Sequence, residues 1–514
     1  MTRPLWSMLL VIVVVFSLMT PASPATAAPD GTLTWAVHIS LAPTFFDPAE
    51  TPGLITPFMV LYAIHDAVAK PMPGQAQEPS LAESWSQSKD GLVWEFVLRK
   101  NVRFHNGELM TAEDVKFSFD RYRGASAKLL KDKVASIEIV GPHRLRFRLK
   151  QPWPDFMTFY ATPATGAAWV VPKKYVEKVG DEGFKKAPVG AGPYKFAAFR
   201  PGVELVLEAH EGYWRKVPNV KTLVLKVIPD EATRLAALKR GEVDIAYSIT
   251  GPLAEELKRT PGLTLKPTYM PFTSWIAPVD QWDPKSPWAD RRVRLAANLA
   301  IDRDSINQAS YLGLAKVSNS VVPSQMEYFW QAPAPRYDAA QARKLLAEAG
   351  YANGFDAGEL NGEMIYGAAI GEPALNYLNA VGIRVRLRLM ERAGYYTEYA
   401  EKKLRGLMHT GSAAFGNAAT RLESYVIGGG RYVYGSHPDM DGLFSEQVNE
   451  TNSRVRQQIL HKIQQMAHER VLLIPVLEPA FLNGVGPRVE THGLNVIPGF
   501  AYSSPYEDLK VKKK

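Results

Sequence analysis

Apolar and polar residues alternate along several short stretches of the chain. Alternation with a period of two over residues 94–99, 144–149 and 203–208 is typical of half-buried strands with one wet face. The apolar and β-branched run 33–39 predicts another strand, which ends at the breaker-rich segment 42–48. The sequence therefore predicts several short strands between residues 33 and 208.

Helical spacing marks other stretches. Thr111 followed by Asp114 resembles a capping box, and Asp230 and Asp338 stand where an N-cap is expected. Ile459 and Ile463 begin a stripe on a further helix. Because helices and strands alternate irregularly along the whole sequence, the pattern favours an α/β class over an all-α or all-β one.

The N-terminus has the three regions of a secretory signal peptide. Arg3 precedes the apolar run 5–19, and small residues follow over 21–28 with a cleavage site at 25–27. A membrane anchor is the alternative, but the run is shorter than the roughly 20 apolar residues that a spanning helix needs. Since no later stretch approaches that length, we expect an exported, soluble mature protein.

Composition narrows the class of protein. The chain has 514 residues, which predicts two to four domains, and 46% hydrophobic with 22% charged residues is ordinary for a folded protein. It has no cysteine, so disulfides, thiolate metal sites and a lipid-modified cysteine are excluded. A free, untethered protein fits the periplasm of a Gram-negative cell. The net charge of +8 is spread out apart from the tail 510–514, so we expect no nucleic-acid partner.

Motifs for chemistry are largely missing. The sequence has no phosphate-binding loop, serine-hydrolase elbow or zinc-protease motif, and the segment 189–194 lacks the third glycine of a dinucleotide loop. His461 and His468 lie two helical turns apart, which is too far to share a metal ion without other ligands. We therefore expect no enzyme activity, no cofactor and no metal site.

Longer segments carry a family resemblance. The first runs from 78 to 119 and includes Glu78-Pro-Ser-Leu-Ala-Glu-Ser-Trp85 and Leu98-Arg-Lys-Asn-Val-Arg-Phe-His-Asn-Gly107. Others are 189–202, 213–215, 230–245, 290–303 and 337–351. Together they resemble the family 5 extracellular solute-binding proteins of ABC importers, which include dipeptide-, oligopeptide- and nickel-binding components.

The resemblance implies a two-lobed periplasmic binding protein fold of type II, similar to cluster C, with an extra subdomain in the first lobe. A solute would bias a hinge toward the closed form, which a membrane permease and ATPase complex then receives. It also implies a monomer. The expected divisions are a signal peptide at 1–28, lobe I at 29–60, 190–278 and 478–514, the extra subdomain at 61–189, and lobe II at 279–477.

The same resemblance implies where the solute lies. The cleft would be built from the segment after the first strand, from a crossing between lobes, and from a loop in lobe II. The expected ligand-binding residues are Thr44, Phe45, Phe46, Phe272, Trp275, Gly411, Ser412, Phe415, Asn417 and Arg421.

The loop 411–421 departs from the family's peptide-binding members. They resemble one another in an acidic residue and an Asp-Pro pair there, whereas this loop has no acid. A buried ammonium without a carboxylate partner is costly, which favours a non-peptide or anionic solute such as an opine, a sugar conjugate or a chelate. Arg421 or Arg431 would meet the anion, unless they are structural or surface residues. A peptide solute is the alternative, and a hydrolase using Ser412 with His409 is a third reading.

Overall fold

The structure is a computed structural model. It describes residues 28–51, 57–161, 165–363, 367–390, 392–413, 416–497 and 499–512. The predicted signal peptide up to residue 27 and Phe415 lie outside the described residues, and Ser412 is described only by its backbone. Within the described ranges, no helix is both long and apolar enough to cross a membrane.

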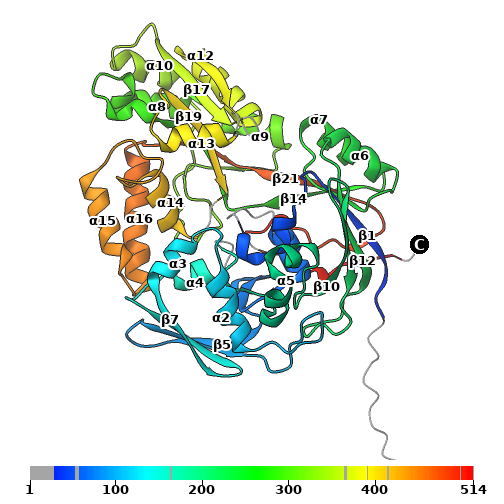
Figure 1. Ribbon diagram of the computed structural model, residues 1–514. Coiled ribbons are helices and arrows are strands. Elements are labelled where there is room, and N and C mark those ends of the chain that lie inside the picture. The colour runs from blue at the N-terminus through cyan, green and yellow to red at the C-terminus, as the bar shows by residue number, and fades with distance from the viewer. Residues whose placement is uncertain are drawn as a thin grey trace, which may run out of the picture.

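The first sheet has seven strands and forms lobe I (Figure 1). Its order is β10 (Tyr194–Arg200), β11 (Glu204–Ala209), β12 (Val220–Val227), β1 (Asp30–Val37), β13 (Ile245–Ala246), β21 (Ala480–Val485) and β14 (Thr264–Tyr269). β1 runs parallel to both of its neighbours, β12 and β13, whereas the remaining pairs are antiparallel.

Two helices cover one part of this sheet. In α6 (Glu231–Lys239), Asp230 caps the N-terminus by accepting a 2.8 Å hydrogen bond from the backbone N–H of Thr233, as the sequence predicts. α7 (Gly251–Arg259) follows. Leu238 and Leu257 from these helices belong to one buried cluster with Leu482 of β21, so burial holds the helices to the sheet.

The extra subdomain contains a four-stranded antiparallel sheet. Its order is β5 (Ala82–Gln87), β6 (Val93–Leu98), β8 (Arg144–Leu149) and β7 (Val134–Gly141). The helices are α2 (Ala112–Arg121), α3 (Ala127–Lys133), α4 (Phe156–Tyr160) and α5 (Lys173–Lys186). The strands confirm the alternating patterns at 94–99 and 144–149, and the capping box of Thr111 and Asp114 is present at the start of α2.

The second sheet has six strands and forms lobe II. Its order is β16 (Lys316–Val317), β20 (Ile474–Glu478), β15 (Phe272–Pro278), β19 (Leu407–Ala413), β17 (Phe355–Glu363) and β18 (Ile383–Met390). The helices around it are α8 (Arg291–Ala300), α9 (Arg303–Tyr311), α10 (Ala339–Glu348), α12 (Glu372–Ala380), α13 (Arg392–Ala400), α14 (Ala418–Tyr425), α15 (Pro438–Val448) and α16 (Ser453–Glu469).

The chain passes between the two sheets at two short joins. One is Met270–Pro271 between β14 and β15, and the other is Pro479 between β20 and β21. β15 pairs with β19 and β20, so residues 272–278 lie in the second sheet, although the expected boundary at 278 would include them in lobe I. The physical reason is that both pairing partners of β15 come from lobe II.

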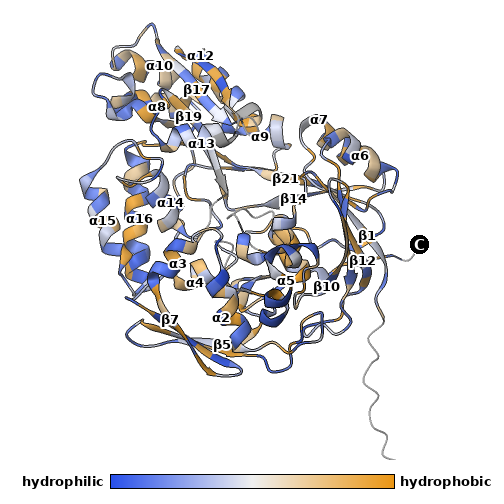
Figure 2. Cartoon of the chain, viewed as in Figure 1, coloured by the Kyte–Doolittle hydropathy of each residue, from blue (hydrophilic) through white to orange (hydrophobic). Residues whose placement is uncertain are grey.

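The buried side chains form separate clusters in the two parts of the molecule that the two large sheets define. One large cluster combines residues of the first sheet with residues of the extra subdomain, such as Leu225 and Phe147. Two other clusters consist of residues between 275 and 477. In Figure 2, apolar stretches occur on helices and strands in both parts of the molecule. Lobe I and the extra subdomain therefore share one core, while lobe II is packed around cores of its own.

Candidate functional site

The segment after the first strand is a pair of short 3-10 turns, η1 (Pro43–Phe46) and η2 (Pro48–Glu50). Thr44 is exposed and Phe45 is half-buried. Phe46 is fully buried, and its ring centroid lies 4.9 Å from that of Phe199 and 5.8 Å from that of Phe196. Phe46 is thus a core residue that anchors the segment, while Thr44 is left accessible.

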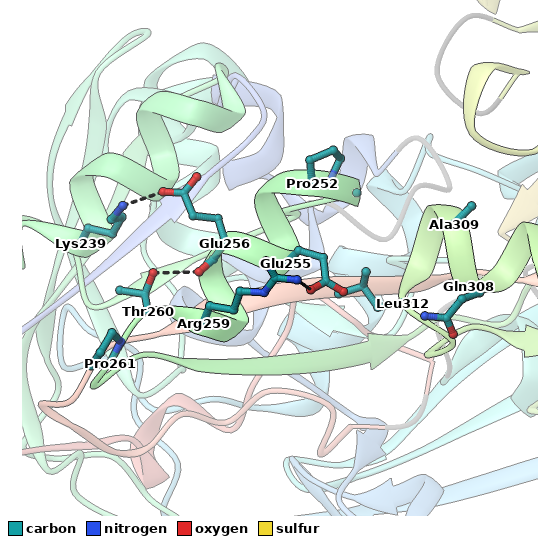
Figure 3. A pocket seen from close by; sticks show the side chains of 11 residues that line it. Lys239, Pro252, Glu255, Glu256, Arg259, Thr260, Pro261, Gln308, Ala309 and Leu312 are labelled. Atoms are coloured by element: carbon teal, nitrogen blue, oxygen red, sulfur yellow. Dashed lines mark hydrogen bonds and ion pairs between the residues drawn. The ribbon is translucent and has the colours of Figure 1, made fainter.

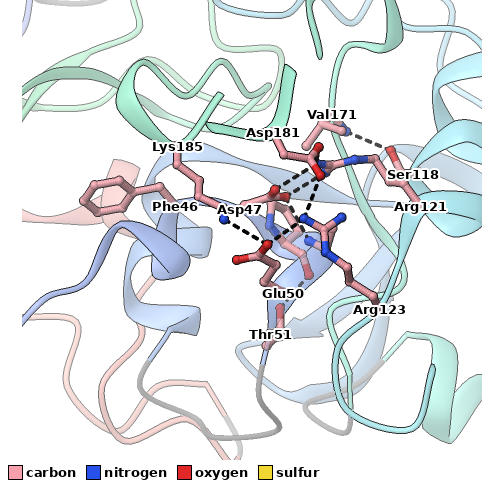
Figure 4. Close-up of polar contacts among 12 residues, drawn as sticks. Phe46, Asp47, Glu50, Thr51, Ser118, Arg121, Arg123, Val171, Asp181 and Lys185 are labelled. Atoms are coloured by element: carbon pink, nitrogen blue, oxygen red, sulfur yellow. Dashed lines mark hydrogen bonds and ion pairs between the residues drawn. The ribbon is translucent and has the colours of Figure 1, made fainter. Parts of the chain in front are cut away.

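A network of ion pairs ties this segment to the extra subdomain (Figure 4). Asp47 is buried and accepts two hydrogen bonds of 2.7 and 2.8 Å from the guanidinium of Arg121. Arg121 also donates to Asp181 at 2.6 Å, which holds the pKa of the Asp181 carboxyl below its usual value. Further pairs join Arg123 to Glu50 and Asp181, and Lys185 to Glu50. The segment is therefore rigidly positioned.

β15 and β19 bring the crossing and the lobe II loop together. In their antiparallel register, Ser274 is opposite Gly411 and Thr273 is opposite Ser412. Phe272 is buried, and it belongs to the core shared by lobe I and the extra subdomain although its strand lies in lobe II. A Cβ atom on Gly411 would lie 2.2 Å from Cζ of Phe272, so any side chain there would force the Phe272 ring to move. Phe272 and Gly411 hence meet where the lobes join.

Arg421 lies on α14 and is 2% exposed. Its guanidinium carbon is 5.2 Å from the ring centroid of Trp275 and 5.5 Å from that of Tyr425, both within cation–π range. Burial lowers the pKa of Arg421 to about 10, and Tyr425 and Tyr396 oppose that change only in part. Arg431, by contrast, is exposed beside Tyr432. Of the two candidate arginines, Arg421 is the one enclosed among aromatic rings.

Asn417 caps α14 and reaches across to the extra subdomain. Its side-chain oxygen accepts a 3.0 Å hydrogen bond from the N–H of Ala419, while its amide donates to the carboxylate of Asp155 at 2.6 Å. Burial, and secondarily the charge of Asp155, raises the pKa of the Glu423 carboxyl. Burial is also the main reason why the pKa of Glu327 is raised. Carboxylates therefore gather beside the loop 411–421, although the loop itself contains none.

Sequence reasoning missed these carboxylates and also a buried polar group in lobe I. Nδ1 of His38, the hydroxyl of Tyr247 and Oγ of Ser503 have no hydrogen-bond partner among the described residues. His38 lies 6.5 Å from Tyr247 between ring centroids, beyond the C-terminal end of β1. In α/β sheets ligands bind outside such strand ends. Burial, assisted by Arg234, lowers the pKa of His38 to about 4.

His409 makes a different contact from the one a Ser412 hydrolase would need. It is 1% exposed, and its Nε2 lies 2.8 Å from Oγ of the fully buried Ser274. Burial lowers its pKa to about 4, and Nδ1 has no hydrogen-bond partner in the described part of the chain. A triad also requires an acid that orients this nitrogen. The described geometry of His409 thus offers no support for a hydrolase.

A separate groove of about 830 Å³ lies between α7 of lobe I and α9 of lobe II (Figure 3). Its wall carries the exposed ion pairs Lys239–Glu256 and Arg259–Glu255, with Gln308 and Leu312 opposite. None of the described residues that the sequence predicts to bind ligand lines this groove. Among the described residues, no cluster of three or more histidines, cysteines or acids is placed to hold a metal ion.

Comparison with known proteins identifies the family. The model of the bacterial extracellular solute-binding proteins, family 5, matches residues 76–432. The chain belongs to this family. It is 28% identical over 465 residues to the heme-binding protein A of Haemophilus influenzae, covering 84% of this chain and 83% of that protein. It is also 28% identical over 518 residues to a probable di/tripeptide-binding protein 5 of Pseudomonas aeruginosa, covering 93% and 95%.

A solved structure supports the fold. The ABC transporter-associated periplasmic binding protein DppA of Helicobacter pylori, in complex with the peptide STSA, superposes with a TM-score of 0.73 at 22% identity. The match covers 95% of this chain and 99% of that one. This confirms the two-lobed periplasmic binding protein fold predicted from the sequence.

Proposed function

We propose that this protein is the periplasmic binding component of an ABC importer. It captures a small solute between its lobes and delivers it to a permease and ATPase complex in the inner membrane. Two lobes with separate cores, joined by the short crossings at Met270–Pro271 and Pro479, support a hinge of this kind. The signal peptide expected at residues 1–28 would export it.

The solute carries an anionic group that contacts Arg421. The observation that carries this proposal is the enclosure of the Arg421 guanidinium by Trp275 and Tyr425, with a pKa lowered mainly by burial. A carboxylate or phosphate matches a guanidinium with two parallel hydrogen bonds, and its charge would offset the cost of burial. Opines, sugar conjugates and chelates fit this chemistry.

A peptide is the second candidate. Glu327 and Glu423 lie beside the Asp155–Asn417 contact, and a protonated α-amino group is the natural partner of such carboxylates. A peptide also has the carboxylate that Arg421 would take. The Pseudomonas relative is named as di/tripeptide-binding.

A thermal-shift panel on solute-free protein tests the proposal. The panel is the dipeptide Met-Leu, glutathione, haem, mannopinic acid and Fe(III)-EDTA. A solute at 100 times its dissociation constant stabilises the folded state by about 2.7 kcal/mol, which raises the Tm measurably. We expect at least one anionic compound to do so, and Arg421→Gln to abolish the shift while the matched control Arg431→Gln keeps it.

Each outcome has a distinct meaning. A shift that survives Arg421→Gln would contradict the role of Arg421 but leave solute binding standing. A shift by Met-Leu alone, lost in a Glu327→Gln, Glu423→Gln double variant, would establish the peptide candidate. Turnover of a panel member would contradict a purely binding function.

A further inference from the structure

Asp155 connects the extra subdomain to lobe II. It lies in the turn before α4, and its side chain contacts two helices of lobe II, α14 and α16, which lie beside α3 and α4 in Figure 1. Its two carboxylate oxygens each accept a 2.6 Å hydrogen bond from Arg456. One of them also accepts from Asn417 at 2.6 Å. The contact therefore joins parts of the chain that are far apart in sequence and lie in different lobes.

Arg456 also has contacts within lobe II. Its Nε donates to Oε1 of the buried Gln447 at 3.0 Å, and its guanidinium carbon lies 5.4 Å from the ring centroid of Tyr328. Both terminal nitrogens donate to Asp155, while these contacts hold the rest of the guanidinium in lobe II. Its side chain is 2% exposed in this structure, and that of Asp155 is 13% exposed. A bidentate contact of this burial is stronger than a surface ion pair.

Arg456 is the cation that compensates the negative charges around Asp155. Asp155 and Glu327 both raise the pKa of Arg456, outweighing the effect of burial. Asp155 in turn disfavours the charged forms of Glu327 and Glu423. Without Arg456, three carboxylates would oppose one another where the extra subdomain meets lobe II.

We propose that Asp155, Arg456 and Asn417 form an interlobe clasp that holds lobe II against the extra subdomain and thereby sets solute affinity. The inference rests on the proposed hinge. If only the closed form retains solute, the apparent dissociation constant is the intrinsic one divided by the closed fraction. Asp155 and Arg456, which are not among the expected ligand-binding residues, are positioning residues, and their loss lowers the closed fraction.

The substitution Asp155→Ala isolates the clasp. Asp155 makes no side-chain capping bond to α4, and the hydrogen bond from the Phe159 N–H goes to its backbone oxygen, so alanine leaves the turn intact. The matched control is Asp439→Ala. Asp439 forms a similar two-pronged pair with Arg470, but both residues belong to lobe II, so that pair is unaffected by closure.

Closure can be measured without any solute because the chain has no cysteine. Gln151→Cys and Arg454→Cys place single thiols at exposed positions on the two sides, four residues before Asp155 and two residues before Arg456 in the sequence. The rate at which a short bismaleimide links them reports the closed population, even when that population is small. Hydrogen bonds between charged groups of this kind are worth roughly a tenfold to hundredfold factor. We expect Asp155→Ala to slow linking by that factor and Asp439→Ala to change it less than twofold.

Equal linking rates in the parent and Asp155→Ala proteins would overturn the clasp. Two further measurements guard against a folding artefact. Arg456→Lys keeps the charge but loses the two-pronged contact and should give an intermediate rate. Added NaCl should slow the parent protein more than Asp155→Ala, and an identical salt response would contradict the proposal. A slowed Asp155→Ala variant in a protein that binds no panel solute would uphold the clasp and refute only the proposed function.

Discussion

Replacing Arg421 with methionine distinguishes an arginine kept for the solute from one kept for the fold. Methionine fills similar space between Trp275 and Tyr425 but removes the charge. A buried structural ion pair that loses one partner typically costs 3–5 kcal/mol of stability, about as much as the largest single substitutions do. A guanidinium held for an incoming anion should behave differently.

The magnitude follows from the burial of Arg421. A pKa lowered from 12.5 to about 10 corresponds to a cost of about 3 kcal/mol for keeping the guanidinium charged in the solute-free protein. The substitution removes this cost but also loses the contacts with two rings, worth about 1–2 kcal/mol in total, and the remaining contacts of the guanidinium. We therefore expect solute-free Arg421→Met to lose less stability than the 3–5 kcal/mol that breaking a buried structural ion pair typically costs.

Urea unfolding of the solute-free proteins measures the change in stability. Calorimetric titration with a panel solute that stabilises the parent protein measures the change in solute affinity. We expect a stability loss of less than about 3 kcal/mol together with at least a hundredfold weaker solute binding, because the anion would enter a site without its cation. A loss of 3 kcal/mol or more in stability with unchanged solute affinity would refute the reasoning and make Arg421 a structural residue.

Two further predictions concern the rigid framework. Burial lowers the pKa of His65 to about 4, whereas the pKa of a histidine in the unfolded chain is 6.5. The unfolded chain therefore binds this proton at a higher pH than the folded protein does. The stability that His65 contributes above pH 6.5 is lost as the pH falls toward 4. Between pH 7.5 and 5 this costs about 2 kcal/mol in urea unfolding, and His65→Gln should remove that part of the slope, whereas an unchanged slope would contradict it. Gly411→Ala should destabilise the protein by about 1–3 kcal/mol through its clash with Phe272. In a double-mutant cycle, adding Phe272→Leu should recover part of that loss. Strictly additive stability changes of the two substitutions would refute the clash.

Local patterns predicted the strands and helix starts well. The alternation at 94–99 and the caps at Thr111 and Asp230 depend on residues within one element, and the structure confirms them. The lobe boundary depends on pairing between β15 and β19, whose residues Ser274 and Gly411 are far apart in sequence. No local pattern shows such pairing, which is why the expected boundary at 278 differs from the sheet assignment of β15.

The site was harder to predict for a similar reason. Phe46 stands in a breaker-rich segment, where the sequence does not distinguish a cleft residue from one that packs on Phe196 and Phe199. The loop 411–421 contains no acidic residue, but Asp155 and Glu327 from other parts of the chain lie close to it. Charge balance in a cleft is a property of the assembled lobes, so a single loop gives only part of it.

Native mass spectrometry of the protein purified from its periplasm without unfolding tests the central claim most directly. A solute enclosed between closed lobes dissociates slowly, so we expect a protein ion carrying one additional small molecule, whose mass and anionic fragments identify it. The addition should disappear on denaturation and in Arg421→Gln. A protein that is folded yet carries no added mass, and that no member of the solute panel stabilises, would contradict solute capture.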